Sequence, residues 1–215
     1  MKSACLTGLL LLALSTTSFA NDLSWDSIGA ELLDVRAITV HPDNPDLLFA
    51  GTSKGLYISE DRAKIWRPVV SVNGQCHGVN YLNFYLKDNN ILYAACGNGL
   101  YCSRNMGKDW KRIFRGKSAL ENNCLAVAVF APVLYLGTEG GLFMSEDNGR
   151  TWHKGPGELG DNEILNIAFD AKEPDTIYLA SVAGVFRGRR RGMSWEKIFT
   201  VHPKENGKED RKSVV

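Results

Sequence analysis

The stretch Ser145-Glu146-Asp147-Asn148-Gly149-Arg150-Thr151-Trp152 decides the fold, because it is a tight polar turn that leads directly into a strand opening with a large aromatic residue. The Asp147 carboxylate can accept hydrogen bonds from backbone N–H groups of its own turn, and Gly149 can take a positive φ. The two flanking hydroxyls can close the remaining turn bonds. The motif therefore predicts a structural turn followed by an aromatic anchor.

The same eight-residue frame recurs along the chain. Two clear copies run from 59 to 66 and from 103 to 110, and an eroded copy runs from 188 to 195. Their tryptophans, at 66, 110, 152 and 195, lie 44, 42 and 43 residues apart, which marks internal repeats of one structural unit. The residues that we assign to these structural turns are Ser59, Asp61, Trp66, Ser103, Asn105, Gly107, Trp110, Ser145, Asp147, Gly149, Thr151, Trp152, Gly192 and Trp195.

Each repeat contains four short apolar runs separated by turns. The second run, as in 91–95, is apolar at consecutive positions, so both faces of its sheet must be covered. Radial stacking of small sheets covers both faces, and about 40 to 45 residues is the length of a four-stranded propeller blade. We therefore predict an all-β propeller with blades at about 30–70, 79–114, 124–156 and 164–199. The single helical signal is at 118–121, where Ser118 can cap one turn.

The repeats predict an incomplete ring. Propellers have roughly 4 to 8 blades, so four repeats close only at the smallest size. A further outer strand is expected at 23–29, around Trp25, but the fourth repeat already has its own outermost strand. Residues 200–215 form a polar tail, expected to be disordered, that is too short to supply three more strands. We expect an open arc with apolar faces at both ends, either from a truncated reading frame or completed by a second copy.

The first twenty residues have the pattern of a cleaved secretory signal. Lys2 precedes the apolar run 9–14, and small residues at 18 and 20 precede a polar start. The protein is therefore expected to be secreted or periplasmic, without a transmembrane segment. Without Lys2 the chain has 24 basic and 24 acidic residues, so nucleic acid is not an expected partner.

Four cysteines follow the leader, Cys76, Cys96, Cys102 and Cys124. An even number suits an oxidising compartment, and two disulfides are open in any of three pairings. Buried free thiols that act as small apolar residues are an equal alternative. The spacing does not match a metal site, so we expect neither a metal nor a cofactor.

Residues 145–152 match Ser-x-Asp-x-Gly-x-Thr-Trp at every motif position, and through them the chain resembles the Asp-box, or bacterial neuraminidase repeat, propellers over 23–199. That family includes sialidases, xyloglucan-cleaving endoglucanases, sortilin-type receptors and the photosystem II assembly factor. The resemblance therefore implies a fold and leaves the function open. It also implies that the boxes are structural and lie between the third and fourth strands of a blade, away from the ligand face.

The opposite ends of the blades should carry any ligand. Candidate residues there are His77, Glu121, Glu139, Asp161 and Glu163. Asp161 and Glu163 are either a general acid and base for a glycosidic bond or ordinary solvated loop residues. Sialidases of this family carry an Arg-Ile-Pro motif that does not occur in this sequence, so we assign no catalytic residue.

A basic cluster stands where the other repeats have an acidic or neutral turn. It comprises Arg187, Arg189, Arg190 and Arg191. The cluster is either a contact for an anion or an acidic protein, or a drifted turn on a solvated rim.

These features favour an exported, non-catalytic propeller that serves as a protein-binding or assembly scaffold and that can self-associate through its open blade faces. The alternative is a fragment of a sialidase-like or xyloglucanase-like glycoside hydrolase propeller that acts on or binds carbohydrate.

Overall fold

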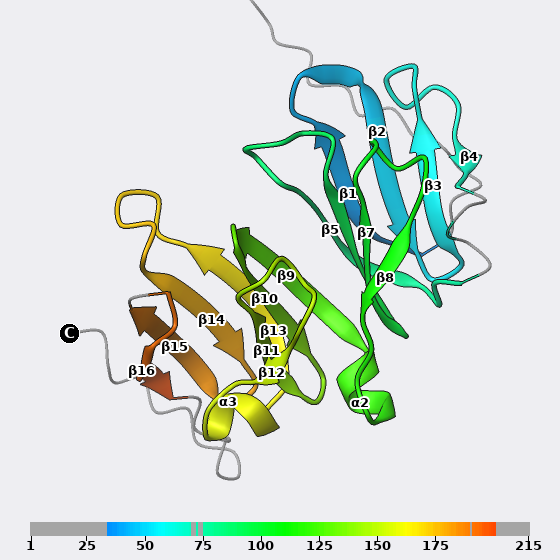
Figure 1. Ribbon diagram of the computed structural model, residues 1–215. Helices are drawn as coiled ribbons and strands as arrows, with labels where there is room; N and C mark the ends of the chain where they lie inside the picture. Colours follow the sequence, from blue (N-terminus) through cyan, green and yellow to red (C-terminus); the bar gives the residue numbers. More distant parts are fainter. Residues whose placement is uncertain (1–33, 70–71, 73–74, 190, 201–215) are drawn as a thin grey trace, which may run out of the picture.

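The computed structural model describes residues 34–69, 72, 75–189 and 191–200, which form four antiparallel four-stranded sheets. In Figure 1 the first sheet (blue and cyan) and the fourth (gold and orange) lie at opposite ends of the molecule. This arrangement confirms the predicted all-β fold of four propeller blades in an open arc. The predicted signal, the strand at 23–29 and the tail beyond residue 200 lie outside the described residues.

Every blade is a meander in which consecutive strands pair antiparallel. Blade 1 consists of β1 (Val35–His41), β2 (Asn44–Thr52), β3 (Gly55–Ser59) and β4 (Arg67–Pro68). Blade 2 consists of β5 (Val79–Phe84), β6 (Leu92–Cys96), β7 (Gly99–Ser103) and β8 (Lys111–Phe114). Blade 3 consists of β9 (Cys124–Phe130), β10 (Val133–Thr138), β11 (Gly141–Ser145) and β12 (His153–Lys154). Blade 4 consists of β13 (Ile164–Phe169), β14 (Ile177–Ser181), β15 (Gly184–Arg189) and β16 (Ser194–Thr200).

Two single-turn helices lie in loops between blades. Helix α2 (Ala119–Asn122) begins after Ser118, whose hydroxyl accepts a hydrogen bond from the Glu121 N–H at 3.2 Å, as the sequence predicted. Helix α3 (Glu158–Asp161) was not predicted, and residues 158–163 were expected to be a polar loop. The N-cap residue before it is Gly157 at φ 52°, which offers no side-chain cap and therefore leaves no capping signal in the sequence.

The blades stack through their first strands, which contact one another in the order β1, β5, β9 and β13. The side chains of β9 face both neighbours: Cys124 and Val127 pack against blade 2, whereas Ala126 and Ala128 pack against blade 4, with a register shift between Cys124 and Ala126. All four are buried. Both faces of a middle blade are thus covered by neighbouring blades, which explains the consecutive apolar residues of β6 and β10.

The sequence left open whether the four cysteines form disulfides or remain buried free thiols, and the structure contains both. Cys76 and Cys96 form a disulfide that joins the segment before β5 to the end of β6. Cys102 and Cys124 are free and buried, and burial raises the pKa of both thiols. The bridge therefore lies within blade 2, while the two thiols fill its interface with blade 3.

The turn at 145–152 is organised around one carboxylate. The Asp147 Oδ1 atom accepts hydrogen bonds from the Ser145 hydroxyl at 2.8 Å and from the N–H groups of Arg150 and Thr151 at 2.9 and 2.8 Å. The Gly149 N–H donates to the Ser145 hydroxyl at 2.8 Å, and Gly149 takes φ 84°. The polar groups of the turn therefore satisfy one another without solvent.

The turns at 59–66 and 103–110 repeat this pattern with different residues. Asn105 replaces the aspartate, and its Oδ1 atom accepts from the Ser103 hydroxyl at 3.0 Å and the Asp109 N–H at 2.9 Å. Asp61 accepts from the Ser59 hydroxyl at 2.8 Å. The amide oxygen of Asn105 thus accepts the hydrogen bonds that a carboxylate oxygen accepts in the other two turns. We refer to the three turns together as the box turns.

The fourth turn lacks the serine and the aspartate but keeps the positive φ angles of its last described turn residues, with Arg191 at φ 57° where Asn148 has φ 59°. Gly192 takes φ 79°, close to the value of Gly149. All four turns also share one backbone hydrogen bond to a carbonyl near the start of the second strand of their own blade. These bonds join Arg62 N to Asp46 O, Met106 N to Asn90 O, Asn148 N to Pro132 O, and Arg191 N to Asp175 O, at 2.9 to 3.2 Å. This shared bond holds the turn where the box residues are lost.

The tryptophans after the turns pack between blades. The Trp152 indole N–H donates to the Ile113 carbonyl of blade 2 at 2.8 Å, and its ring meets the edge of Phe114 with centroids 5.3 Å apart. Trp110 and Trp195 also pack against the cores between their own and the preceding blade, although the Trp110 indole N–H donates to Gly107 within its own turn. The regular spacing of these residues is therefore the spacing of the blade interfaces.

The Asp147 hydrogen bonds predict a graded response to substitution. We expect Asp147→Ala to lower the melting temperature, because it leaves two N–H groups of the turn without their acceptor. Asp147→Asn should lower it less, since Asn105 makes the equivalent bonds in blade 2. Thermal melts followed by circular dichroism measure both values. Equal losses in the two variants would contradict the role of the Oδ1 atom.

The same carboxylate predicts a dependence of stability on pH. Hydrogen bonds from Thr151 and Ser145 hold the pKa of Asp147 well below its usual 3.8 in the folded protein. Because the folded pKa is the lower one, the stabilisation is fully present above pH 3.8 and is lost as pH falls toward the folded pKa. Urea unfolding between pH 7 and pH 3 should show a smaller loss of unfolding free energy in Asp147→Asn than in the wild type.

Candidate binding face

One end of the blades is formed by the turns between second and third strands and by the segments that lead into the first strands. We call this end the binding face. In every blade the turn donates a backbone hydrogen bond to the leading segment. These bonds join Ser53 N to Asp34 O, Gly97 N to His77 O, Glu139 N to Asn123 O, and Val182 N to Glu163 O, at 2.9 to 3.3 Å. His77, Glu139 and Glu163 therefore lie at this end of the blades, and their role in ligand binding stays a prediction.

A chain of side-chain hydrogen bonds crosses three blades on this face. Arg36 pairs with Asp34 at 2.9 Å, and its Nη1 atom donates to Asn80 Oδ1 at 3.0 Å. Asn80 Nδ2 donates to Asn123 Oδ1 at 2.9 Å, and Asn123 Nδ2 donates to Glu139 Oε1 at 2.7 Å. The hydrogen bond from Arg36 lowers the pKa of Asp34. The chain begins and ends on a carboxylate and fixes the side chains between them.

Asparagines also join blade 2 to the backbone of blade 3. Asn80 Nδ2 donates to the Cys124 carbonyl at 2.9 Å, and Asn83 Nδ2 donates to the Val127 carbonyl at 3.1 Å. Both carbonyls belong to β9, the first strand of blade 3. The polar groups of the binding face therefore hold the blades in register as well as facing solvent.

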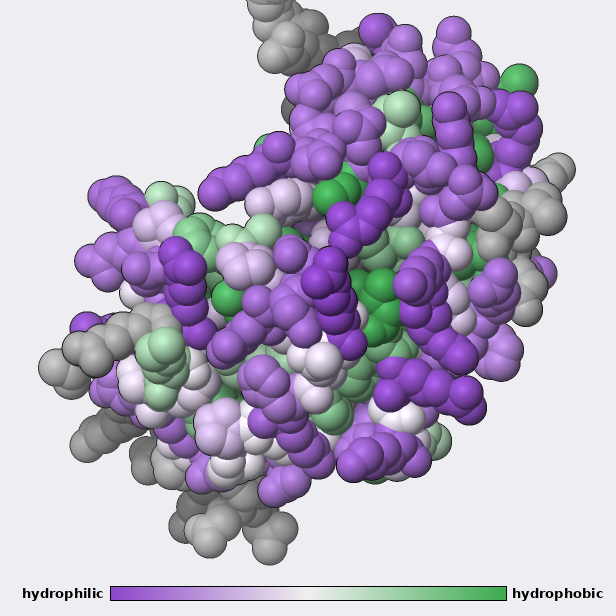
Figure 2. All heavy atoms as spheres, in the orientation of Figure 1, coloured by the Kyte–Doolittle hydropathy of each residue, from purple (hydrophilic) through white to green (hydrophobic). Residues whose placement is uncertain are grey.

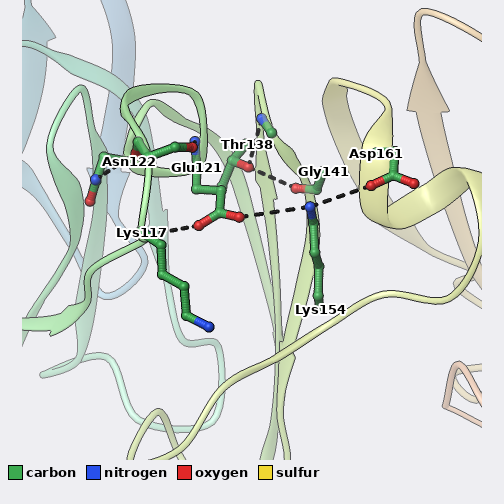
Figure 3. Close-up of polar contacts among 9 residues, drawn as sticks. Lys117, Glu121, Asn122, Thr138, Gly141, Lys154 and Asp161 are labelled. Atoms are coloured by element: carbon green, nitrogen blue, oxygen red, sulfur yellow. Dashed lines mark hydrogen bonds and ion pairs between the residues drawn. The ribbon is translucent and has the colours of Figure 1, made fainter.

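A second polar cluster lies where α2 and α3 flank blade 3. Figure 3 shows Lys154 reaching between two carboxylates, with its ammonium 3.7 Å from Glu121 and 3.4 Å from Asp161. Glu121 also accepts the Lys117 N–H at 2.7 Å and is largely buried, whereas Asp161 is exposed. Lys154 therefore neutralises a carboxylate held by α2 and contacts a second one on α3.

The structure does not bring together Asp161 and Glu163, the two carboxylates that the sequence offered as a general acid and base. Asp161 lies on α3 and is paired with Lys154, whereas Glu163 follows the helix and contributes its backbone carbonyl to the turn bond with Val182. In the described part of the chain, no contact joins the two side chains. The pair that shares a neighbour is Glu121 with Asp161, which come from different loops.

His77 and the cysteines do not gather into a metal site. His77 is exposed, and its backbone N–H donates to Asn98 Oδ1 at 3.1 Å. Within residues 34–69, 72, 75–189 and 191–200, no group of three His, Cys, Asp or Glu side chains is placed to hold a metal ion.

The arginines of blade 4 lie mainly in ion pairs. Arg187, on β15, pairs with Glu196 at 2.8 Å, and Arg191 pairs with Asp175 at 3.0 Å. Arg191 also lies over the Phe130 ring, 4.9 Å from its centroid. Arg189 is exposed, and Arg190 lies outside the described residues. An anion contact at this cluster stays a prediction that depends chiefly on Arg189.

Blade 1 exposes an apolar face at one end of the arc. Ile38 is 63% exposed, and Val35 and Val40 are exposed beside it. One repeat later the corresponding residue of blade 2, Leu82, is 6% exposed, because it packs against blade 1. The β1 face therefore has the composition of a blade interface, and no sheet among the described residues packs in front of it.

Blade 4 exposes the complementary face at the other end. Phe199 pairs with Val185 on the outer strand and is 59% exposed. Phe114 occupies the same place in blade 2, where it is 4% exposed and packs against Phe143 of blade 3, with centroids 4.8 Å apart. Leu165 and other apolar residues of blade 4 are exposed as well. Phe199 is thus exposed at a position where the equivalent residue of blade 2 packs against the following blade.

Sequence reasoning missed Arg36, Asn123 and Lys154. A signal for the first two existed, since Arg36, Asn80 and Asn123 lie 44 and 43 residues apart, one repeat each. Polar residues that recur at the repeat length are expected to lie side by side on neighbouring blades. Lys154 carried no such signal, because its partners lie on two loop helices whose packing the repeat does not determine.

One face of the molecule is mostly polar. The face in Figure 2 is mainly hydrophilic, with small apolar patches between charged side chains. No helix among the described residues is long and apolar enough to cross a membrane.

Comparisons with solved structures show that the fold is that of a β-propeller. An ancestral GH74 enzyme aligns with 76% of this chain at a TM-score of 0.65 and 21% identity. The extracellular domain of BT4673, a one-component system of B. thetaiotaomicron, aligns with 79% at a TM-score of 0.62 and 18% identity. YCF48 from Cyanidioschyzon merolae aligns with 76% at a TM-score of 0.56 and 14% identity.

This chain spans only part of these proteins. It covers 25% of the ancestral GH74 enzyme, 22% of the BT4673 domain and 55% of YCF48. No family model and no curated protein matches the sequence. At these identities the likeness shows the fold alone.

The asparagine chain predicts a measurable stabilisation. We expect Asn80→Leu to lower the unfolding free energy by about 1–3 kcal/mol, because it leaves the Cys124 carbonyl and the Asn123 side chain without their donor. Asn90→Leu is the matched control, since the Asn90 side chain bonds only within its own exposed turn. Chemical denaturation of both variants gives the comparison. A loss of unfolding free energy no larger in Asn80→Leu than in the control would contradict the stabilising role of the side-chain hydrogen bonds through Asn80.

Proposed function

We propose that this protein is an exported, non-catalytic propeller segment that serves as an assembly scaffold, and that the partner of its open blade faces is a second copy of the chain. The observation that carries the proposal is the pair of exposed faces at the two ends of the arc. Ile38 and Phe199 lie in places where Leu82 and Phe114 are buried by a neighbouring blade.

The two faces are complementary by construction of the repeat. The β1 face corresponds to the face with which blades 2, 3 and 4 pack against the blade before them. The outer face of blade 4 corresponds to the face that receives the blade after it. A second copy therefore offers each end the kind of surface that covers the same positions inside the chain.

Ring closure sets the size of the assembly. Two copies that meet at both ends supply twice the four sheets of one chain, which reaches the upper end of the range of roughly 4 to 8 blades seen in propellers. Burial of both apolar faces is the driving force for this closure. A head-to-tail contact that closes on itself also leaves no end for further growth.

The leader pattern of residues 1–20 supports export. The likeness to an extracellular domain is compatible with it.

Sedimentation velocity of the chain without its leader tests the assembly. We expect a dimer in the wild type and a monomer in Ile38→Lys and in Phe199→Lys, because a charge in a blade interface remains without a partner. Leu86→Lys is the matched control, since Leu86 is also exposed but lies in the turn between β5 and β6. A monomeric wild type, or a dimer that both substitutions leave intact, would overturn the proposal.

The structural match to GH74 enzymes supports a second candidate function, that of a carbohydrate-active propeller. In that case Glu121 and Asp161 are the carboxylates to examine, because Lys154 brings them near each other. Incubation with xyloglucan and with chromogenic sialosides is the test. Turnover that is lost in Asp161→Asn would establish the hydrolase and displace the scaffold function.

A further inference from the structure

A hollow of about 720 Å³ lies between the outer edge of blade 2 and the box turn of blade 3. Its lining includes Arg104 after β7, Lys111 and Arg112 on β8, and Asn148 and Arg150 of the box turn. Figure 2 shows strongly hydrophilic side chains gathered near the middle of the face, over β8. Four cationic side chains from three segments thus border one cavity.

These four cations lack protein partners in the described part of the chain. None of their side chains makes a hydrogen bond or an ion pair there, whereas Arg36, Arg62 and Arg67 each pair with a carboxylate. The nearby carboxylates of Asp109 and Asp147 are bound within their own turns, Asp109 to Asn105 at 2.8 Å.

The other blades show that the fold does not require this charge pattern. Arg104 and Lys111 occupy the places of Glu60 and Arg67 in blade 1, where the two side chains form an ion pair. The same two places hold Glu146 and His153 in blade 3, and Arg189 and Glu196 in blade 4. Blade 2 alone sets two permanent cations against each other.

The corresponding hollow between blades 1 and 2 differs from this cavity in the charge of its lining. It holds about 520 Å³ and is lined by Glu60, Lys108 and apolar residues such as Leu47 and Val69. One repeat later, Arg104 replaces Glu60 and Arg150 replaces Lys108. The hollow therefore occurs at both of these junctions, and the acidic residue that lines it between blades 1 and 2 is replaced by an arginine between blades 2 and 3.

We propose that this cavity binds a ligand carrying two or more oxyanion groups, such as phosphate, sulfate or carboxylate. Guanidinium groups bind such anions through paired N–H donors, and like charges held together favour a multivalent counter-ion. The wall of the cavity is fixed, because Trp152 bonds to the Ile113 carbonyl and a Cβ atom at Gly149 would meet the Ile113 side chain at 2.9 Å. The site lies at the box-turn end of the blades, away from the binding face, and is independent of the assembly proposed above.

Calorimetric titration of the chain without its leader tests the site with three probes: inorganic pyrophosphate, a sulfated disaccharide and digalacturonate. We expect at least one of them to bind, with an affinity that falls as salt is raised from 20 to about 300 mM. Binding of pyrophosphate alone assigns phosphate chemistry, and binding of either disaccharide alone assigns an acidic glycan. Failure of all three probes to bind at low salt would overturn the proposal.

Arg104→Glu is the informative variant, because it recreates the Glu60 and Arg67 pattern of blade 1 and should leave the melting temperature unchanged or higher. We expect it to weaken binding about tenfold or more, the scale of a lost charge-assisted contact. Lys54→Glu makes the same charge change in the exposed turn between β2 and β3 and should bind as the wild type does. Equal affinity in Arg104→Glu and the wild type would refute the site even if a probe binds.

Discussion

The structure depends on the requirement that both faces of every small sheet be covered by another sheet. A four-stranded meander has too little apolar surface to be stable alone, so each blade relies on its neighbours. The first strands show this directly, since Cys124 and Val127 of β9 face one blade while Ala126 and Ala128 face the other. Among the described residues the end blades meet the requirement on one side only, and Ile38 and Phe199 are exposed. The association that we propose would follow from the same constraint as the architecture.

The fold could be predicted from the sequence because its signals are local and recur at one period. The tryptophans mark the blade interfaces, and the box turn reads directly as a set of side chains that bond their own backbone. The backbone bond that joins each box turn to the start of the second strand of its blade could not be predicted, since it leaves no side-chain signature. That bond explains why the turn at Gly192 keeps its path after losing the serine and the aspartate.

The side-chain partners on the binding face were harder to predict, because they depend on contacts between loops. Sequence proximity suggested that Asp161 and Glu163 form a pair, yet α3 turns Asp161 toward Lys154. The short helix could not be recognised in the sequence, since the residue that precedes it is Gly157, which has no side chain to cap the helix. The hydrogen bonds that link Arg36, Asn80 and Asn123 could have been predicted, because these three residues recur at the repeat length. Repeats therefore predict contacts between equivalent positions and give no information on insertions.

Comparison of equivalent positions also separates what the fold needs from what it merely permits. The place of Glu60 and Arg67 is an exposed strand edge, where an ion pair contributes little to stability and can be lost without unfolding a blade. That freedom allows Arg104 and Lys111 to stand together in blade 2, at the wall of a cavity whose shape the box turn of blade 3 already fixes. A repeat protein can in this way change the charge of one junction while the interfaces around it stay the same. Function in such a chain is therefore to be sought where one repeat departs from the other three, and the junction of blades 2 and 3 departs in charge.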